Sequence, residues 1–166
     1  MRGNLIKYNH IYRVIGPGSV GTTCIYLDDM FSSAVVYGNV LVECYRGFLL
    51  GGGRNNIAMN NIFINNTISI HIDDRGLTWA NPTQIMANLL AMPYNNSLWA
   101  SYYPELSHIL DSHPLQPVGN LVQFNLVTMN LQEDLKHIIP LFLTRVCNMT
   151  LFQSRWLWLC SSFLVF

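Results

Sequence analysis

The sequence predicts an all-β fold, a parallel β-helix built from coils of about 22 residues. Two observations predict the repeat: short alternating strand patterns recur at a nearly constant step, and Asn and Gly residues occupy equivalent turn positions between them. A third observation is the composition, with 51% hydrophobic and only 11% charged residues, which argues against a disordered chain. The 166 residues are therefore enough for one domain with a buried core.

The first recurring element is a turn that follows a short strand. It is found in the segments KYNHI (Lys7–Ile11), VYGNV (Val36–Val40), AMNNI (Ala58–Ile62) and QFNLV (Gln123–Val127). Asn tolerates the left-handed backbone of such turns and can hydrogen-bond to the next coil. We therefore expect a ladder of Asn9, Asn60 and Asn125, with Asn39 or Asn61 beside them, in preference to a ligand-binding role for these side chains.

The second recurring element is a longer strand, IYLDD from Ile25, FLLGG from Phe48 and IHIDD from Ile70. Alignment at steps of 23 and then 22 residues keeps two columns apolar, and these would point inward. The columns are Ile25, Phe48 and Ile70, and Leu27, Leu50 and Ile72. An antiparallel sandwich is the rival fold, but its strands do not usually repeat a side-chain column three times at constant period.

The repeat divides the chain into a partial β-helix over residues 1–130 and an apolar tail over 131–166 that does not continue it. An insertion rich in Trp, Tyr, Met and Pro interrupts the β-helix at residues 77–118. Its aromatic residues either cover a face of the sheet or form the wall of a cleft in which sugar rings stack.

Helical spacing within the insertion predicts helices over Pro82–Ala91 and Pro104–Asp111. Asn81 or Thr83 and Ser101 are the expected residues of the cap regions. A further helix is possible from Leu131 to Leu143, interrupted by Pro140.

Charge and cysteine content exclude several function classes. The formal net charge is zero, so no basic surface indicates nucleic acid. Cys24, Cys44, Cys147 and Cys160 have no metal-binding spacing, and we expect them to be reduced rather than paired in disulfides.

The start of the chain lacks the pattern of a signal peptide, and the C-terminal WLWLCSSFLVF is too short to span a bilayer, so we expect no membrane span.

The candidate site lies at the ends of the longer strands. Asp28, Gly51 and Asp73 share one column, and Asp29, Gly52 and Asp74 share the next. Carboxylates two coils apart are roughly 9 to 10 Å apart at the backbone, which suits a water molecule between an acid and a base. The alternative is that the acids and the Gly51–Gly53 triplet simply form tight turns.

Four further residues are candidates for contacts with a substrate. Arg54 and Arg75 follow their strands at similar places, where they either bind substrate or form surface ion pairs. His71 should face outward beside the acids, and Trp79 could stack on a sugar ring. No residues are predicted to bind a metal.

The motifs IYLDDM, YGNV, RGFLLGGGRNN, NNIF and HIDDRGLTWA resemble those of right-handed parallel β-helix proteins of the pectate-lyase-like superfold. The resemblance covers about Asn4 to Thr128 and is closest to the carbohydrate-active branch related to glycoside hydrolase family 141. It implies a secreted or surface-associated protein that acts on a polysaccharide or oligosaccharide. Proteins of that group have many more coils than this chain, so we expect a fragment or an altered gene product.

The resemblance implies a hydrolase in which Asp28, Asp29, Asp73 and Asp74 supply the acid and base, with no cofactor. Arg54, His71 and Arg75 would then contact the substrate. Two alternatives remain open, namely a polysaccharide lyase that holds calcium with its acids, and a non-catalytic glycan-binding or structural β-helix.

Overall fold

In a computed structural model of the chain, the described residues are 2–17 and 21–128, with the backbone of short strands at 145–146, 149–151 and 157–160. They form two compact units. Unit 1 comprises Met1–Asp73 and Pro117–Phe166, and unit 2 is the segment Asp74–Gln116. The predicted helix over Leu131–Leu143 lies outside the described residues.

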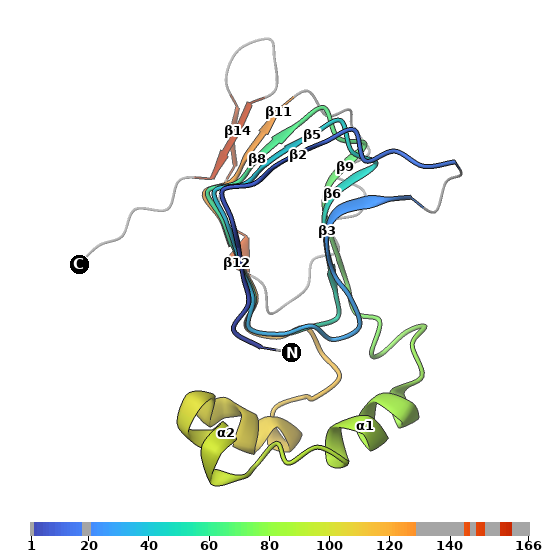
Figure 1. The fold of residues 1–166 in the computed structure, drawn as a ribbon, viewed down its shortest axis with the longest axis vertical. Helices are drawn as coiled ribbons and strands as arrows, with labels where there is room; N and C mark the ends of the chain where they lie inside the picture. The colour runs from blue at the N-terminus through green and yellow to red at the C-terminus, as the bar shows by residue number, and fades with distance from the viewer. Residues whose placement is uncertain (1, 18–20, 129–144, 147–148, 152–156, 161–166) are drawn as a thin grey trace, which may run out of the picture. The chain divides into compact units, whose positions relative to one another are not determined.

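Unit 1 is a parallel β-helix, as predicted, in which the first three coils each contribute one strand to each of three sheets. Strands of successive coils lie over one another when unit 1 is viewed along its stack of coils (Figure 1). The first sheet contains β1 (Leu5–Lys7), β4 (Val35–Tyr37), β7 (Ile57–Met59), β10 (Leu121–Gln123) and β12 (Arg145–Val146) in that order. The second contains β2 (His10–Tyr12), β5 (Val40–Val42), β8 (Ile62–Ile64), β11 (Leu126–Thr128), β14 (Leu157–Cys160) and β13 (Met149–Leu151). The third contains β3 (Thr23–Leu27), β6 (Arg46–Gly51) and β9 (Ile68–Asp73).

All strand pairs of the repeat are parallel, whereas β14 pairs antiparallel with β11 and with β13. The strands are rich in Val and Ile, whose branched side chains pack well on a pleated surface.

The described coils turn at corners that share one backbone conformation. A residue with positive φ lies at each corner, and from the second coil onward the residue that follows it is buried. The positive-φ residues are Gly3, Ser33, Asn55 and Gly119 at the first corner, Tyr8, Gly38, Asn60 and Phe124 at the second, and Arg13, Glu43 and Asn65 at the third. This conformation turns the chain sharply, and non-Gly residues adopt it only where their surroundings compensate the strain.

Asn side chains in the interior connect the coils at these corners. At the second corner, Asn9 donates to Asn39, Asn39 to Asn61 and Asn61 to Asn125, each with its backbone N–H and its side-chain amide. Asn39 and Asn61 are fully buried. A second ladder joins Asn56 to Asn120 at the first corner.

The prediction of a ladder is confirmed, but its proposed member Asn60 is wrong. Asn60 is exposed and holds the positive φ of the turn, and its neighbour Asn61 makes the ladder bonds. Adjacent Asn residues are ambiguous in sequence because Asn suits both positions.

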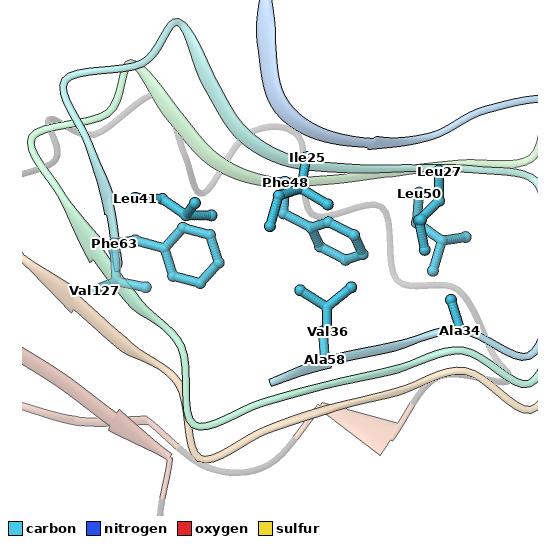
Figure 2. Close-up of a cluster of buried hydrophobic side chains, with 10 residues drawn as sticks. All are labelled: Ile25, Leu27, Ala34, Val36, Leu41, Phe48, Leu50, Ala58, Phe63 and Val127. Atoms are coloured by element: carbon cyan, nitrogen blue, oxygen red, sulfur yellow. The ribbon is translucent and has the colours of Figure 1, made fainter. Parts of the chain in front are cut away.

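The core lies between the three sheets. The side chains that meet there include Phe48 and Leu50 from the third sheet, Leu41 and Phe63 from the second, and Val36 from the first (Figure 2). The register pairs Ile25 with Phe48 and Ile70, and Leu27 with Leu50 and Ile72, which confirms both predicted apolar columns.

The coils differ in length only where the chain leaves the stack. Successive ladder residues Asn39 and Asn61 are 22 residues apart, whereas Asn9 and Asn39 are 30 apart and Asn61 and Asn125 are 64 apart. The longest step contains unit 2. The hydrogen bonds at all three steps are alike, so the insertions leave the coil geometry unchanged.

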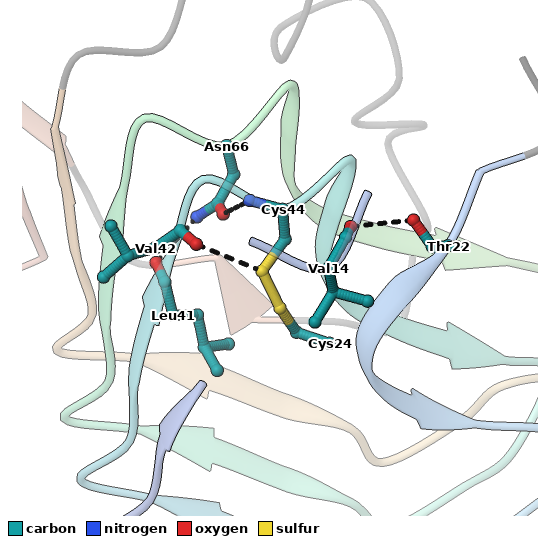
Figure 3. Close-up of a disulfide and its surroundings, with 7 residues drawn as sticks. All are labelled: Val14, Thr22, Cys24, Leu41, Val42, Cys44 and Asn66. Atoms are coloured by element: carbon teal, nitrogen blue, oxygen red, sulfur yellow. Dashed lines mark hydrogen bonds between the residues drawn. A yellow bond between two sulfur atoms is a disulfide. The ribbon is translucent and has the colours of Figure 1, made fainter. Parts of the chain in front are cut away.

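Cys24 and Cys44 form a disulfide, which corrects the prediction of reduced cysteines (Figure 3). Their Cα atoms lie 6.3 Å apart, within the usual range for a disulfide. Their separation of 20 residues is close to one coil, and this spacing was the available signal that they lie on adjacent coils.

Unit 2 contains α1 (Pro82–Leu90), α2 (Ser97–Tyr102) and the 3-10 helix η1 (Pro104–Asp111). Asn81 caps α1 by accepting from the Gln84 N–H, as predicted. The prediction for Ser101 is wrong, because Asn96 caps α2 and Ser101 lies inside that helix. Among the described residues, no helix has the length and apolar character needed to cross a membrane.

Candidate functional site

The candidate site begins on the outward face of the sheet β3-β6-β9. Leu27 and Leu50 point into the core. Because side chains alternate along a strand, the residues directly before and after each of these leucines face outward. Tyr26, Leu49 and His71 form one such outward column. Tyr26 is exposed, His71 is half-buried and Leu49 is buried.

Asp28 and Asp73 fall on the next outward column, on either side of Gly51. Asp73 pairs directly with Gly51, and Asp28 follows Leu27, the partner of Leu50. Adjacent strands are about 4.7 to 4.9 Å apart, so the two backbones are separated by roughly 9.5 Å. The register that was predicted for the acids is thus the register of the sheet.

Asp28 also has a role in the turn that ends β3. Its Oδ1 accepts a hydrogen bond of 2.9 Å from the Asp29 N–H, and Asp29 and Met30 both have positive φ. The Met30 N–H then donates to the Gly51 carbonyl at 2.8 Å. The turn fixes the position of the Asp28 carboxylate, and the side chain remains exposed.

Backbone geometry explains two of the three glycines in the triplet Gly51–Gly53. A Cβ on Gly53 would collide with the Phe31 carbonyl oxygen, and Gly52 has a φ of +73°. These two positions therefore require glycine for a close approach and for a left-handed turn. The structure supports the turn interpretation at Gly52, whereas Gly53 allows the close approach of the Phe31 backbone.

Arg54 follows the triplet and is buried, with 6% of its surface exposed. The backbone N–H of Arg54 donates to Ser32 Oγ at 3.2 Å, and its backbone carbonyl accepts from the Ser33 backbone N–H at 2.9 Å. Arg54 is therefore a buried residue rather than a surface residue.

The remaining candidates belong to unit 2. Asp74 Oδ1 accepts from the Thr78 hydroxyl at 3.1 Å, and the guanidinium of Arg75 lies 4.7 Å from the centre of a Trp79 ring. Arg75 is only 1% exposed, so it is not a surface residue, whereas Trp79 is 65% exposed. Asp74, Arg75 and Trp79 form one local group, and Asp28, Asp73 and His71 form another on unit 1.

No metal site is evident in the part of the chain that the structure describes. No three side chains of His, Cys, Asp or Glu there are close enough to hold an ion. Cys24 and Cys44 are oxidised to a disulfide and so are not available as thiolate ligands.

Comparison with known proteins identifies the family. The family model described as periplasmic copper-binding protein (NosD) matches residues 1–102, which include the first coils of unit 1 and the predicted acids. No match was found among curated proteins or among solved structures. The chain therefore belongs to the NosD family of β-helix proteins.

Proposed function

We propose that this β-helix binds a polysaccharide along its third sheet and hydrolyses it with Asp28 and Asp73. The observation that carries the proposal is the common outward column of the two acids, separated by a strand whose residue in that column is Gly51. The resemblance to the branch related to glycoside hydrolase family 141 motivates the choice of reaction.

Hydrolysis with inversion needs one carboxylic acid to protonate the leaving oxygen and one carboxylate to activate water. The acids of such enzymes are about 6.5 to 9.5 Å apart, which leaves room for the water. A backbone separation of roughly 9.5 Å between two outward side chains agrees with this geometry. A retaining enzyme, with acids about 5 to 5.5 Å apart, agrees less well.

Asp28 and Asp73 are better candidates than their neighbours in the chain. Asp29 forms the left-handed turn, and Asp74 lies in unit 2, where it binds Thr78. His71 and Tyr26, on the adjoining outward column, would contact the substrate. Trp79 presents an aromatic surface suited to a sugar ring, and Arg75 packs against that ring.

An extracytoplasmic location is part of the proposal. The description of the family is periplasmic, and disulfides such as Cys24–Cys44 persist in oxidising compartments. The family is also described as copper-binding, and copper prefers imidazole and sulfur ligands, but no group of three or more His, Cys, Asp or Glu that could hold an ion occurs among the described residues.

The test is a panel of neutral and acidic polysaccharides treated with the full chain and assayed for new reducing ends. Asp28→Asn and Asp73→Asn should each lower the rate by about 100-fold or more, because an amide cannot exchange the proton. Asp29→Asn is the matched control and should keep most of the activity. Equal loss in all three variants would assign the effect to the turn rather than to catalysis.

The lyase alternative predicts a different product, namely unsaturated sugar ends that form only with calcium. Adding a chelator to the same assay distinguishes the two reactions. Non-catalytic glycan binding is the second candidate, favoured by the turn hydrogen bond that already engages Asp28. Binding without any cleavage, unchanged in Asp73→Asn, would establish it.

A further inference from the structure

A pocket of about 360 Å³ lies at the third corner of unit 1, where the chain passes from the second sheet to the third. It is lined by Ile15, Glu43, Cys44, Tyr45, Asn65 and Thr67. This corner precedes β6 and β9, whereas the acids lie at the far ends of the same sheet. The volume is at the lower end of the range for small-molecule sites. We propose that this pocket binds one neutral sugar ring, at a site separate from the acids.

The polar side chains of the pocket come from equivalent positions on adjacent coils. Glu43 and Asn65 occupy the left-handed position of the corner, with φ of +52° and +51°. The following residues, Cys44 and Asn66, are buried, and the Cys44 N–H donates to Asn66 Oδ1 at 2.8 Å (Figure 3). The Cys24–Cys44 disulfide fixes the same corner covalently. The pocket is therefore built on a rigid backbone.

The Tyr45 ring is also held in place. A Cβ on Gly21 would overlap this ring, so the ring packs directly against the Gly21 backbone. The Arg46 guanidinium lies 5.5 Å from the ring centre, and the Tyr45 N–H donates to the Val14 carbonyl at 3.2 Å. An aromatic side chain fixed in this way contributes apolar contact without a large entropy cost on binding.

The charges at the pocket favour a neutral ligand. Glu43 is the charged side chain among the described residues that line the pocket, and its carboxylate already accepts a hydrogen bond of 3.1 Å from Arg13 Nε, so its charge is compensated. Asn65 and Thr67 supply an amide and a hydroxyl, which both donate and accept. A sugar ring satisfies this set, because its hydroxyls donate and accept in turn and its C–H surface suits Tyr45 and Ile15.

The pocket and the acids lie at opposite ends of the third sheet. The strand Arg46–Gly51 is six residues long, which corresponds to about 17 Å at 3.3 Å per residue. An oligosaccharide on the outward face could therefore occupy both sites. The pocket does not depend on catalysis by the acids, so it deepens the proposed function without requiring it.

The test is a titration of the full chain with methyl glucoside, methyl galactoside and methyl mannoside. NMR signals of the Asn65 side-chain amide should shift, and calorimetry should give the affinity. Asn65→Gly keeps the left-handed backbone and removes the amide, and Thr67→Val removes the hydroxyl at nearly constant shape. Each should weaken binding by about twofold to tenfold, the effect of one lost hydrogen bond.

Asn60→Gly is the matched control, since Asn60 is an exposed left-handed Asn at a different corner. It should leave the affinity unchanged. The proposal is overturned if none of the three glycosides binds, or if one binds and both pocket variants bind it as well as the parent. A failure of polysaccharide cleavage alone would contradict the catalytic proposal and leave the pocket intact.

Discussion

Asn61 shows how much one residue contributes to this fold. Its Oδ1 accepts two hydrogen bonds from Asn39, and its Nδ2 donates to the Val36 carbonyl at 3.0 Å. Asn61→Ala would leave these buried partners without their bonds, so we expect the free energy of unfolding to fall by about 3 kcal/mol or more. Urea denaturation followed by circular dichroism measures it.

The neighbouring residue provides the control for that measurement. Asn60→Gly removes an exposed side chain at a backbone conformation that glycine accepts, so its effect should stay within about 0.5 kcal/mol. Similar losses in both variants would contradict the assignment of the ladder to Asn61.

Residue types at the corners could be predicted only in part. Asn60 and Gly38 are of residue types that indicate a left-handed backbone, but Tyr8 and Phe124 have the same backbone conformation at this corner and are not. The surroundings impose that conformation on them, and a single sequence contains no record of those surroundings. For the same reason, the sequence did not show that Asn60 holds the turn and Asn61 makes the ladder bonds.

At the scale of elements, the third sheet depends on its central strand. Phe48 in β6 is fully buried and packs in the core between β3 and β9. Phe48→Ala should lower the free energy of unfolding by about 3 to 5 kcal/mol, because the cavity cannot collapse between two fixed neighbours. Thermal unfolding followed by circular dichroism measures the loss.

Tyr26→Ala is the comparison for Phe48, since Tyr26 lies on the same sheet with 46% of its surface exposed. It should cost about 1 kcal/mol or less. A loss at Tyr26 as large as that at Phe48 would mean that the outward face is part of the core.

The strands could be predicted because the repeat supplied their register. The apolar columns at Ile25 and Leu27 recur on each coil, and a wrong register would expose them. The helix α2 was missed because Ser97–Tyr102 is only six residues long and shows too little periodicity. The column of Asp28 and Asp73 followed from the same repeat, whereas the pocket around Tyr45 depends on how a corner folds.

At the scale of the whole molecule, the Cys24–Cys44 disulfide joins two coils. It closes a loop of about 20 residues, for which the chain-entropy estimate is about 3 kcal/mol. We therefore expect dithiothreitol to lower the midpoint of urea unfolding. The Cys24→Ala/Cys44→Ala variant should have the lower midpoint from the start and no response to the reductant.

Cys147 and Cys160 provide the control, because the effect is assigned to the other two cysteines. The Cys147→Ala/Cys160→Ala variant should respond to dithiothreitol as the parent does. Loss of the response in this variant would contradict the assignment.

Unit 2 should be dispensable for the fold of unit 1. The ladder step from Asn61 to Asn125 is 64 residues, which exceeds the 22 of the preceding step by 42. The hydrophobic core cluster of unit 1 contains no residue from Asp74–Gln116. Deletion of residues 75–116 restores a 22-residue coil, so we expect the β-helix circular dichroism and a cooperative unfolding transition to persist.

Deletion of four further residues is the matched control, because it breaks the period and moves Asn125 away from Asn61. If the 42-residue deletion unfolds the chain as the longer one does, unit 2 is a structural part of the coil rather than an insertion in it.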